Sequence, residues 1–329
     1  MRAILGLVVL AACGSTAGKS TTTEVPRPVI TTAADKILPL LPDGAQVVIE
    51  VDLARLRANA LVGPLVIKAL STDGLPALPG YVPMSPLSTA EAIVLASYGV
   101  GTPNAATLTI VATKQPVPGG TRLAEDLVAL GPSEWTAQLE ARAAIGGLGL
   151  GARSNEEIAD AYASAGIAAS PELLRLRDHA MPPKAPGASL RITARLPFDA
   201  RVSLARQTGL PSAPAQVSVW ADVVDDFAIV VDADAADPGD NKTGRAAKQL
   251  EASVRGLLAA AAAEPAVKLL GIPASLNNAK TIAQGTWVRT IIAIGPERLQ
   301  RVVQRATAYL DTQPAKPTAS PDAKPEGTL

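Results

Sequence analysis

The sequence predicts an α+β protein in which antiparallel sheets carry helices packed on one face. Two observations predict this class. Neighbouring strand patterns are separated only by tight turns, which makes the strands antiparallel, and pairs of strands alternate with single helical patterns. The resulting strand–strand–helix unit occurs twice from Gln216 onward and once, more loosely, from Trp135.

The first elements follow a turn signal at Leu41–Gly44. A β-branched strand is predicted at 46–53, with Glu50 and Asp52 alternating outward, and 54–70 has a helical pattern interrupted at Gly63-Pro64. A Pro-rich loop spans 71–88. The further elements predicted in this region are strands at 91–98 and 106–113, a short helix at 121–130, a hairpin of 135–143 with 145–152, a helix at 155–165 and a second short helix from 170.

The pattern is clearer after residue 181. Strands are predicted at 189–196, 216–224, 227–234, 280–284 and 287–294, with a long amphipathic helix at 245–262. A final helix opens at Pro296 and turns Leu299, Val302 and Val303 inward. Because both valines lie at the centre of its apolar stripe, one or both should be nearly fully buried.

The composition restricts the function. Of the 329 residues, 48% are hydrophobic but only 3% are aromatic, so aliphatic side chains must fill the interior. Sites for sugars or single-stranded nucleic acid rely on aromatic faces, which argues against either ligand. Thirty Lys and Arg residues balance thirty Asp and Glu residues, so no basic excess is available for a nucleic-acid backbone.

The amino-terminal residues indicate export. Arg2 precedes an apolar stretch at 3–12, which suits a signal peptide and is too short for a permanent membrane span. The stretch ends in Leu10-Ala11-Ala12-Cys13, which resembles the lipobox of bacterial prolipoproteins. This resemblance implies a diacylglyceryl group on the sulfur of Cys13, cleavage before Cys13, and acylation of the new amine, for example with palmitate.

The residue after the cysteine is Gly14 instead of Asp, which in enteric bacteria implies sorting to the outer membrane. We therefore expect a lipid-anchored protein of the cell envelope, facing the periplasm. The predicted organisation is a signal peptide at 1–12, the lipidated cysteine and a flexible tether at 13–35, an N-terminal α+β region at 36–180, a C-terminal α+β region at 181–310 and a disordered Pro-rich tail at 311–329.

Two glycine-rich stretches look like nucleotide-binding motifs. Gly18-Lys19-Ser20 ends like a P-loop, but Cys13 stands where that motif requires glycine. The run 147–152 satisfies G-x-G-x-x-A, but the next helical pattern starts only at Ser154 or Asn155, whereas a dinucleotide fold opens its helix at the glycines. We interpret neither stretch as a cofactor site.

Two further groups carry polar chemistry. Oxygen donors gather at Asp232, Asp234, Asp237, Asp240 and Asn241, but Ala236 and Asp237 depart from the EF-hand pattern, so we interpret them as turn residues, with a weak Ca²⁺ site as the alternative. His179, the only histidine, is predicted near the end of a short helix, where a histidine interacts favourably with the helix dipole. No catalytic residue, cofactor or metal site is predicted.

Residues 41–63 also resemble the opening of uncharacterised exported proteins of high-GC Gram-negative bacteria, and this resemblance implies no activity. The leading hypothesis is a non-enzymatic interaction or scaffold module whose protein partner the sequence does not identify. The alternative is a periplasmic carrier or chaperone for an apolar ligand such as lipid, with an aliphatic interior that could line a cavity. An exported hydrolase with a dispersed active site is the third hypothesis.

Overall fold

A computed structural model describes residues 32–42, 44–71, 85–146, 175–183, 185, 187–209, 213–235 and 244–312. Several predictions lie wholly or mostly outside these ranges. Among them are the signal peptide with Cys13, most of the tether, most of the Pro-rich loop at 71–88, the strand at 145–152 with its glycine motif at 147–152, and the helix at 155–165. Of the predicted tail, only Asp311 and Thr312 are described.

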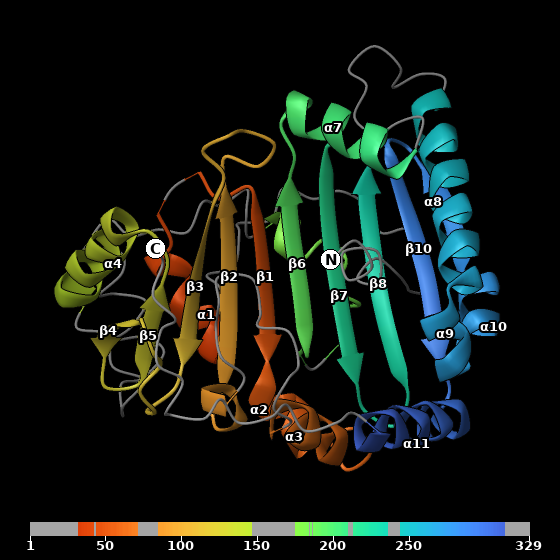
Figure 1. Ribbon diagram of the computed structural model, residues 1–329. Coiled ribbons are helices and arrows are strands. Elements are labelled where there is room, and N and C mark those ends of the chain that lie inside the picture. Colours follow the sequence, from red (N-terminus) through yellow and green to blue (C-terminus); the bar gives the residue numbers. More distant parts are fainter. Residues whose placement is uncertain are drawn as a thin grey trace, which may run out of the picture.

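A 10-stranded sheet forms the centre of the protein, in the order β4-β5-β3-β2-β1-β6-β7-β8-β10-β9 (Figure 1). Every neighbouring pair is antiparallel, which confirms the predicted α+β class. Because β1 pairs with both β2 and β6, the two predicted regions share one sheet. The strands are β1 (Val47–Asp52), β2 (Ala92–Tyr98), β3 (Ala106–Ala112), β4 (Thr121–Ala124), β5 (Leu127–Leu130), β6 (Leu190–Arg195), β7 (Gln216–Val223), β8 (Phe227–Asp234), β9 (Lys280–Gln284) and β10 (Trp287–Ile294).

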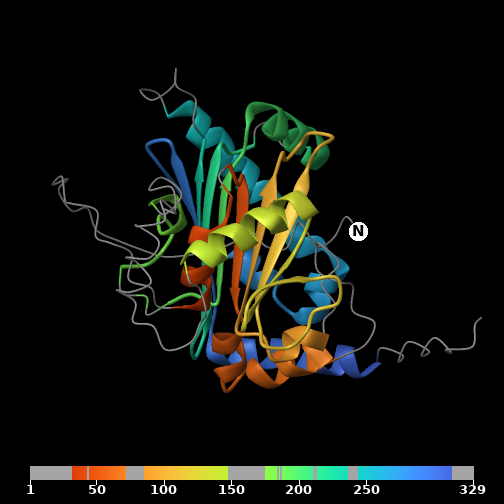
Figure 2. The ribbon, with the colours of Figure 1, turned by 90° about the vertical axis from the view of Figure 1, so that its left-hand side faces the viewer.

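Helices surround this sheet on its faces and ends (Figures 1 and 2). Two predicted strand–strand–helix units are confirmed, β7-β8-α8 and β9-β10-α11. No helix within the described ranges is long and apolar enough to cross a membrane. The helices are α1 (Ala33–Ile37), η1 (Leu38–Leu40), α2 (Leu53–Ala58), α3 (Gly63–Ser71), η2 (Ser85–Ser88), α4 (Ser133–Gly146), α7 (Phe198–Thr208), α8 (Arg245–Ala263), α9 (Pro265–Leu270), α10 (Pro273–Asn277) and α11 (Pro296–Thr312).

Successive side chains along a strand point to opposite faces of the sheet. We call face A the face that carries Val48 and Glu50 of β1, and face B the face that carries Ile49 and Val51. In the N-terminal half, α1, η1 and α4 cover face A, where they enclose an aliphatic cluster that includes Val94, Leu108, Ile110, Ala129 and Leu139. Face B of the same strands packs against α2, α3 and η2.

The sequence-based reading of residues 121–146 was wrong in two places. Residues 121–130 form the β4–β5 hairpin instead of a helix, because all four side chains of β5 are buried and its backbone pairs with β3. The predicted strand at 135–143 belongs to α4. Leu139 and Ala143 lie one helical turn apart and are both buried, so packing selects the helical period over the alternating one.

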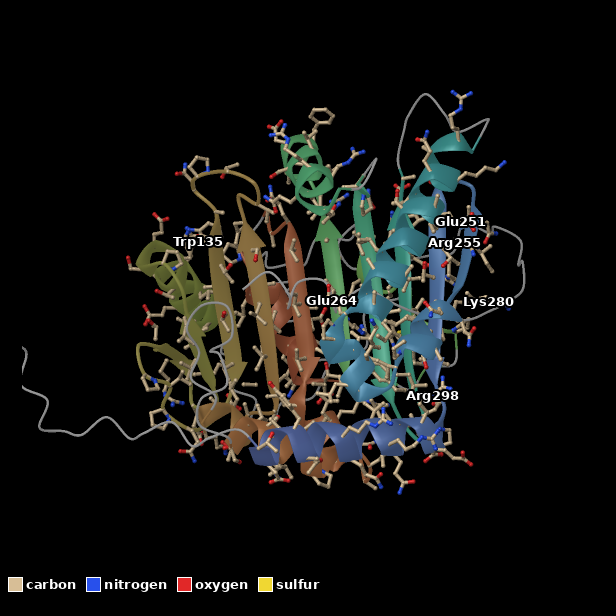
Figure 3. The ribbon with its side chains drawn as sticks, turned by 45° about the vertical axis from the view of Figure 1, so that its right-hand side comes forward. Trp135, Glu251, Arg255, Glu264, Lys280 and Arg298 are labelled. Atoms are coloured by element: carbon tan, nitrogen blue, oxygen red, sulfur yellow. The ribbon has the colours of Figure 1, made fainter. Side chains whose placement is uncertain are left out.

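Helix α11 begins at Pro296 as predicted, but Val302 and Val303 are only half-buried and Leu299 alone is buried. The expectation that a valine would be nearly fully buried is therefore wrong. The reason is position, because α11 lies across one end of the sheet against α3 and α9 (Figure 1). Arg298, labelled in Figure 3, donates to Oγ of Ser275 on α10 at 3.0 Å.

Candidate functional site

Face A changes character in the C-terminal half of the sheet. Thr193, Ser218, Asp232 and Arg289 are direct cross-strand neighbours on β6, β7, β8 and β10, so they form one polar row. Residues 175–183, 185 and 187–188, which we call the crossing segment, run over this face before the chain enters β6. Three groups of ionic contacts on face A make up the candidate site.

The first group is centred on Arg177 of the crossing segment. Its guanidinium donates to both carboxylate oxygens of Glu50 on β1, at 2.7 and 2.5 Å, and to Asp35 of α1 at 2.5 Å. Burial lowers the pKa of Arg177, but the carboxylates of Glu50 and Asp35 outweigh this effect and hold the pKa above its usual value. The Arg177 and Glu50 side chains are 8% and 4% exposed, so this ion pair is shielded from water.

The second group contains the only histidine. Nδ1 of His179 lies 2.7 Å from Oδ2 of Asp232, and its ring stacks on Trp287 with centroids 3.9 Å apart. Arg289 donates through Nε and Nη2 to the two oxygens of Asp232, at 2.7 and 2.5 Å. Burial raises the pKa of Asp232, but hydrogen bonds from Arg289 and His179 lower it more, and the net pKa lies below the usual value.

The third group joins helix α2 to strand β7. Arg55 donates through Nε and Nη2 to Asp222 at 2.7 and 2.6 Å, and Oγ of Ser189 donates to the same carboxylate at 2.6 Å. Gly187 leaves room for this pair, because a Cβ there would lie 3.1 Å from Nη1 of Arg55. The carbonyl of Gly187 accepts from Nε1 of Trp220 at 2.8 Å, which fixes the end of the crossing segment.

The chemistry available to these groups is limited by their partners. A His–Asp pair is the base of a nucleophilic triad when a hydroxyl lies against the free imidazole nitrogen. Ser218, the row neighbour of Asp232, instead donates its hydroxyl to the carbonyl of Arg177 at 3.2 Å and accepts from the amide of Ala180 at 3.1 Å. Among the described residues, no three His, Cys, Asp or Glu side chains are grouped so as to hold a metal ion.

The structure corrects two interpretations of single residues. Glu50 does not point to solvent, because Arg177 covers it and leaves it 4% exposed. His179 pairs with the Asp232 carboxylate, a role distinct from the predicted favourable position at a helix end. Asp232 and Asp234 lie on β8, whereas Asp237, Asp240 and Asn241 are outside the described residues, so the Ca²⁺ alternative is not tested.

Sequence reasoning missed Arg55, Arg177, Asp222 and Arg289. A signal existed for two of them, because Asp222 and Arg289 are the charged residues within the strands β7 and β10. A charged residue within a strand needs a partner where it faces inward. The partner itself is 167 residues away for Asp222 and 57 for Arg289, which no local pattern reveals.

Comparison with known proteins gives little further information. No family model matches the chain, and no curated protein matches it. Crystal form I of TP0453 is similar with 9% identity over 82% of this chain and 96% of that one, at a TM-score of 0.35. Crystal form III of TP0453 gives 9% identity over 81% and 96%, at a TM-score of 0.38. These TM-scores are too low to assign a fold or a function to this chain.

Proposed function

We propose that the chain is a lipoprotein of the cell envelope whose folded body is a non-enzymatic interaction scaffold. Lipidated Cys13 would hold it in the outer membrane, with the body facing the periplasm. The anchor is supported by the run Leu10-Ala11-Ala12-Cys13 at the end of an apolar stretch. The described residues begin at Thr32, which caps α1, and residues 14–31 separate it from Cys13 in the sequence.

One observation carries the scaffold part of the proposal. The inward carboxylates of Glu50, Asp222 and Asp232 are each bound by an arginine that belongs to another element, 127, 167 and 57 residues away. The groups that a catalytic site would use thus hold α2 and the crossing segment to the sheet and strand β8 to strand β10. A buried carboxylate held by an arginine of fixed geometry favours one arrangement of the two elements that carry them. A body held in one shape suits the presentation of a surface to a partner.

Metabolic labelling with an alkyne analogue of palmitate tests the anchor. The full-length chain should carry the label and enter the detergent phase of a Triton X-114 extract. The Cys13→Ser chain should lose the label and stay in the aqueous phase. Label retained by Cys13→Ser would contradict the anchor, because this is the only cysteine in the sequence.

Native mass spectrometry tests the scaffold against the lipid carrier. The full-length Cys13→Ser chain, purified from the periplasm without detergent, should appear at masses of protein alone. A stoichiometric phospholipid adduct that survives purification would contradict the scaffold and favour the carrier.

A further inference from the structure

Helix α7 connects β6 to β7 in the chain and lies across one end of the sheet, at the top of Figure 1. Its inner side is fixed by Ala200, which is 4% exposed and packs against Gly101 of the β2–β3 loop. A Cβ at Gly101, where φ is +85°, would lie 3.0 Å from Cα of Ala200, so only glycine allows this approach. The contact determines which side of α7 faces away from the protein.

Two apolar side chains lie on the outward side of α7. Phe198 is 72% exposed and Val202 is 40% exposed, and residues four apart are neighbours on a helix surface. An amphipathic helix normally turns its apolar stripe to the core, whereas this one turns a phenylalanine and a valine to solvent. Phe198 has the largest exposed fraction among the exposed large hydrophobic side chains of the described residues.

Two exposed charges flank this stripe. Asp199 and Arg206 are seven residues apart, which is close to two helical turns, so they lie on the same side of the stripe. Their midpoint falls between Val202 and Ser203, at the centre of the helix. Two copies of α7 related by a twofold axis through this point run antiparallel, and each Asp199 then faces Arg206 of the second copy.

We propose that α7 is a self-association surface that docks antiparallel against α7 of a second copy of this chain. Phe198 and Val202 form the apolar centre, and the two Asp199–Arg206 pairs set the direction. The charge pattern selects this occupant, because opposite charges placed symmetrically about the helix centre complement themselves.

The contact is small and the dimer correspondingly weak. A helix of 11 residues is about 16 Å long, so two such helices cannot bury the roughly 1,200 Å² of a stable interface without help from neighbouring loops. Dimerisation in solution therefore needs high concentration. If Cys13 is lipidated as proposed above, confinement to a membrane raises the effective concentration, but the docking itself does not depend on the anchor.

Cross-linking in the full-length Cys13→Ser chain tests the proposal. With no other cysteine present, Val202→Cys places one thiol near the twofold axis, and a short bismaleimide should link two copies. Asp199→Arg should lower the yield at least about tenfold, since both charge pairs become repulsive, and Asp199→Arg with Arg206→Asp should restore it. Leu269→Cys on α9, which is 55% exposed, is the matched control and should give little cross-linked product.

Three results would overturn the proposal. The first is an equal yield of cross-linked dimer at Val202→Cys and Leu269→Cys. The second is a Val202→Cys yield that Asp199→Arg leaves unchanged. The third is a chain with Asp199→Arg and Arg206→Asp that circular dichroism shows to be folded but that still gives little cross-linked dimer. Sedimentation of the Cys13→Ser chain gives an independent measurement. A monomer up to millimolar concentration, with vesicle flotation that depends on Phe198, would assign the stripe to a membrane and contradict self-association.

Discussion

The two halves of the sheet stabilise the same face in different ways. In the N-terminal half, face A is aliphatic, and Leu108 and Ile110 are fully buried beneath α1 and α4. In the C-terminal half, face A carries Arg191 and Asp232, and the crossing segment binds them through Asp178 at 2.8 Å and His179 at 2.7 Å. The difference shows how a chain with few aromatic residues attaches a segment of little regular structure. Directional ion pairs specify its position where apolar packing alone would not.

The largest effect is expected when one partner of the most buried ion pair is removed. Arg177→Met removes the guanidinium that binds both Glu50 and Asp35, while Arg191 on β6 remains as the cross-strand neighbour of Glu50, and should lower the free energy of unfolding by about 3–5 kcal/mol. Adding Glu50→Met should recover part of this loss, because the buried carboxylate is removed, whereas Asp35 and Arg191 have each lost one oppositely charged neighbour. Denaturant midpoints of the single and double variants measure both changes, and a double variant no more stable than Arg177→Met would contradict the prediction.

The matched control for Arg177 is an exposed ion pair of similar length. Arg255 and Glu251 of α8, labelled in Figure 3, lie 2.7 Å apart with Arg255 58% exposed. Arg255→Met should cost no more than about 1 kcal/mol, since water screens exposed pairs. Equal losses for both arginines would refute the distinction between the shielded and the exposed pair.

The apolar half should respond to loss of volume and be insensitive to pH. Ile110→Ala removes most of a side chain that is 0% exposed and should cost about 2–5 kcal/mol. Ile282→Ala on the edge strand β9, where the side chain is 46% exposed, should cost well under about 1 kcal/mol. The loss for Ile110→Ala should be the same at pH 7 and pH 4 in chemical denaturation, and a loss that varied with pH would contradict the apolar assignment.

The ion-paired half should respond to acid. Because the pKa of Asp232 is lowered in the folded state, its stabilisation is complete above the unfolded pKa of about 3.9 and is lost as the pH falls through the folded pKa. Asp232→Asn should therefore cost about 1–3 kcal/mol at pH 7, through loss of charged hydrogen bonds, and progressively less below pH 4. A constant difference from pH 7 to pH 3 would show that the charge does not contribute.

The smallest effect is expected at Asp52, where the pKa shift has the opposite sign. Burial raises the pKa of this carboxyl, with Arg55 opposing and Asp222 adding to the increase, so its charge costs stability above the folded pKa and not below the unfolded one. Asp52→Asn keeps an oxygen for the amide of Arg55, which Asp52 caps at 2.8 Å. It should stabilise by less than about 1 kcal/mol at pH 7, and not at all at pH 3.

The control at this position is Asp52→Ala, which removes the cap as well as the charge. It should destabilise by about 1 kcal/mol relative to Asp52→Asn. If Asp52→Asn and Asp52→Ala had the same midpoint, the oxygen would not be acting as a helix cap.

The sequence alone determined the antiparallel α+β class, the two strand–strand–helix units after Gln216 and the start of the last helix at Pro296. Hydropathy periodicity and turn residues encode these features within a few neighbours, so they can be read locally. The same local signal failed at 121–130, where pairing of β5 with β3 overrides a weak helical pattern.

Only the tertiary structure decided which charges meet. Periodicity tells which side of a strand a residue takes, but it does not tell whether that side is covered, as Glu50 beneath Arg177 demonstrates. Nor did the sequence reveal that Ala200 faces inward and leaves Phe198 outside. Both depend on contacts between residues far apart in the chain. Glu50 needs Arg177 because a buried unpaired charge costs free energy, and Ala200 faces inward because burying an apolar side chain gains free energy.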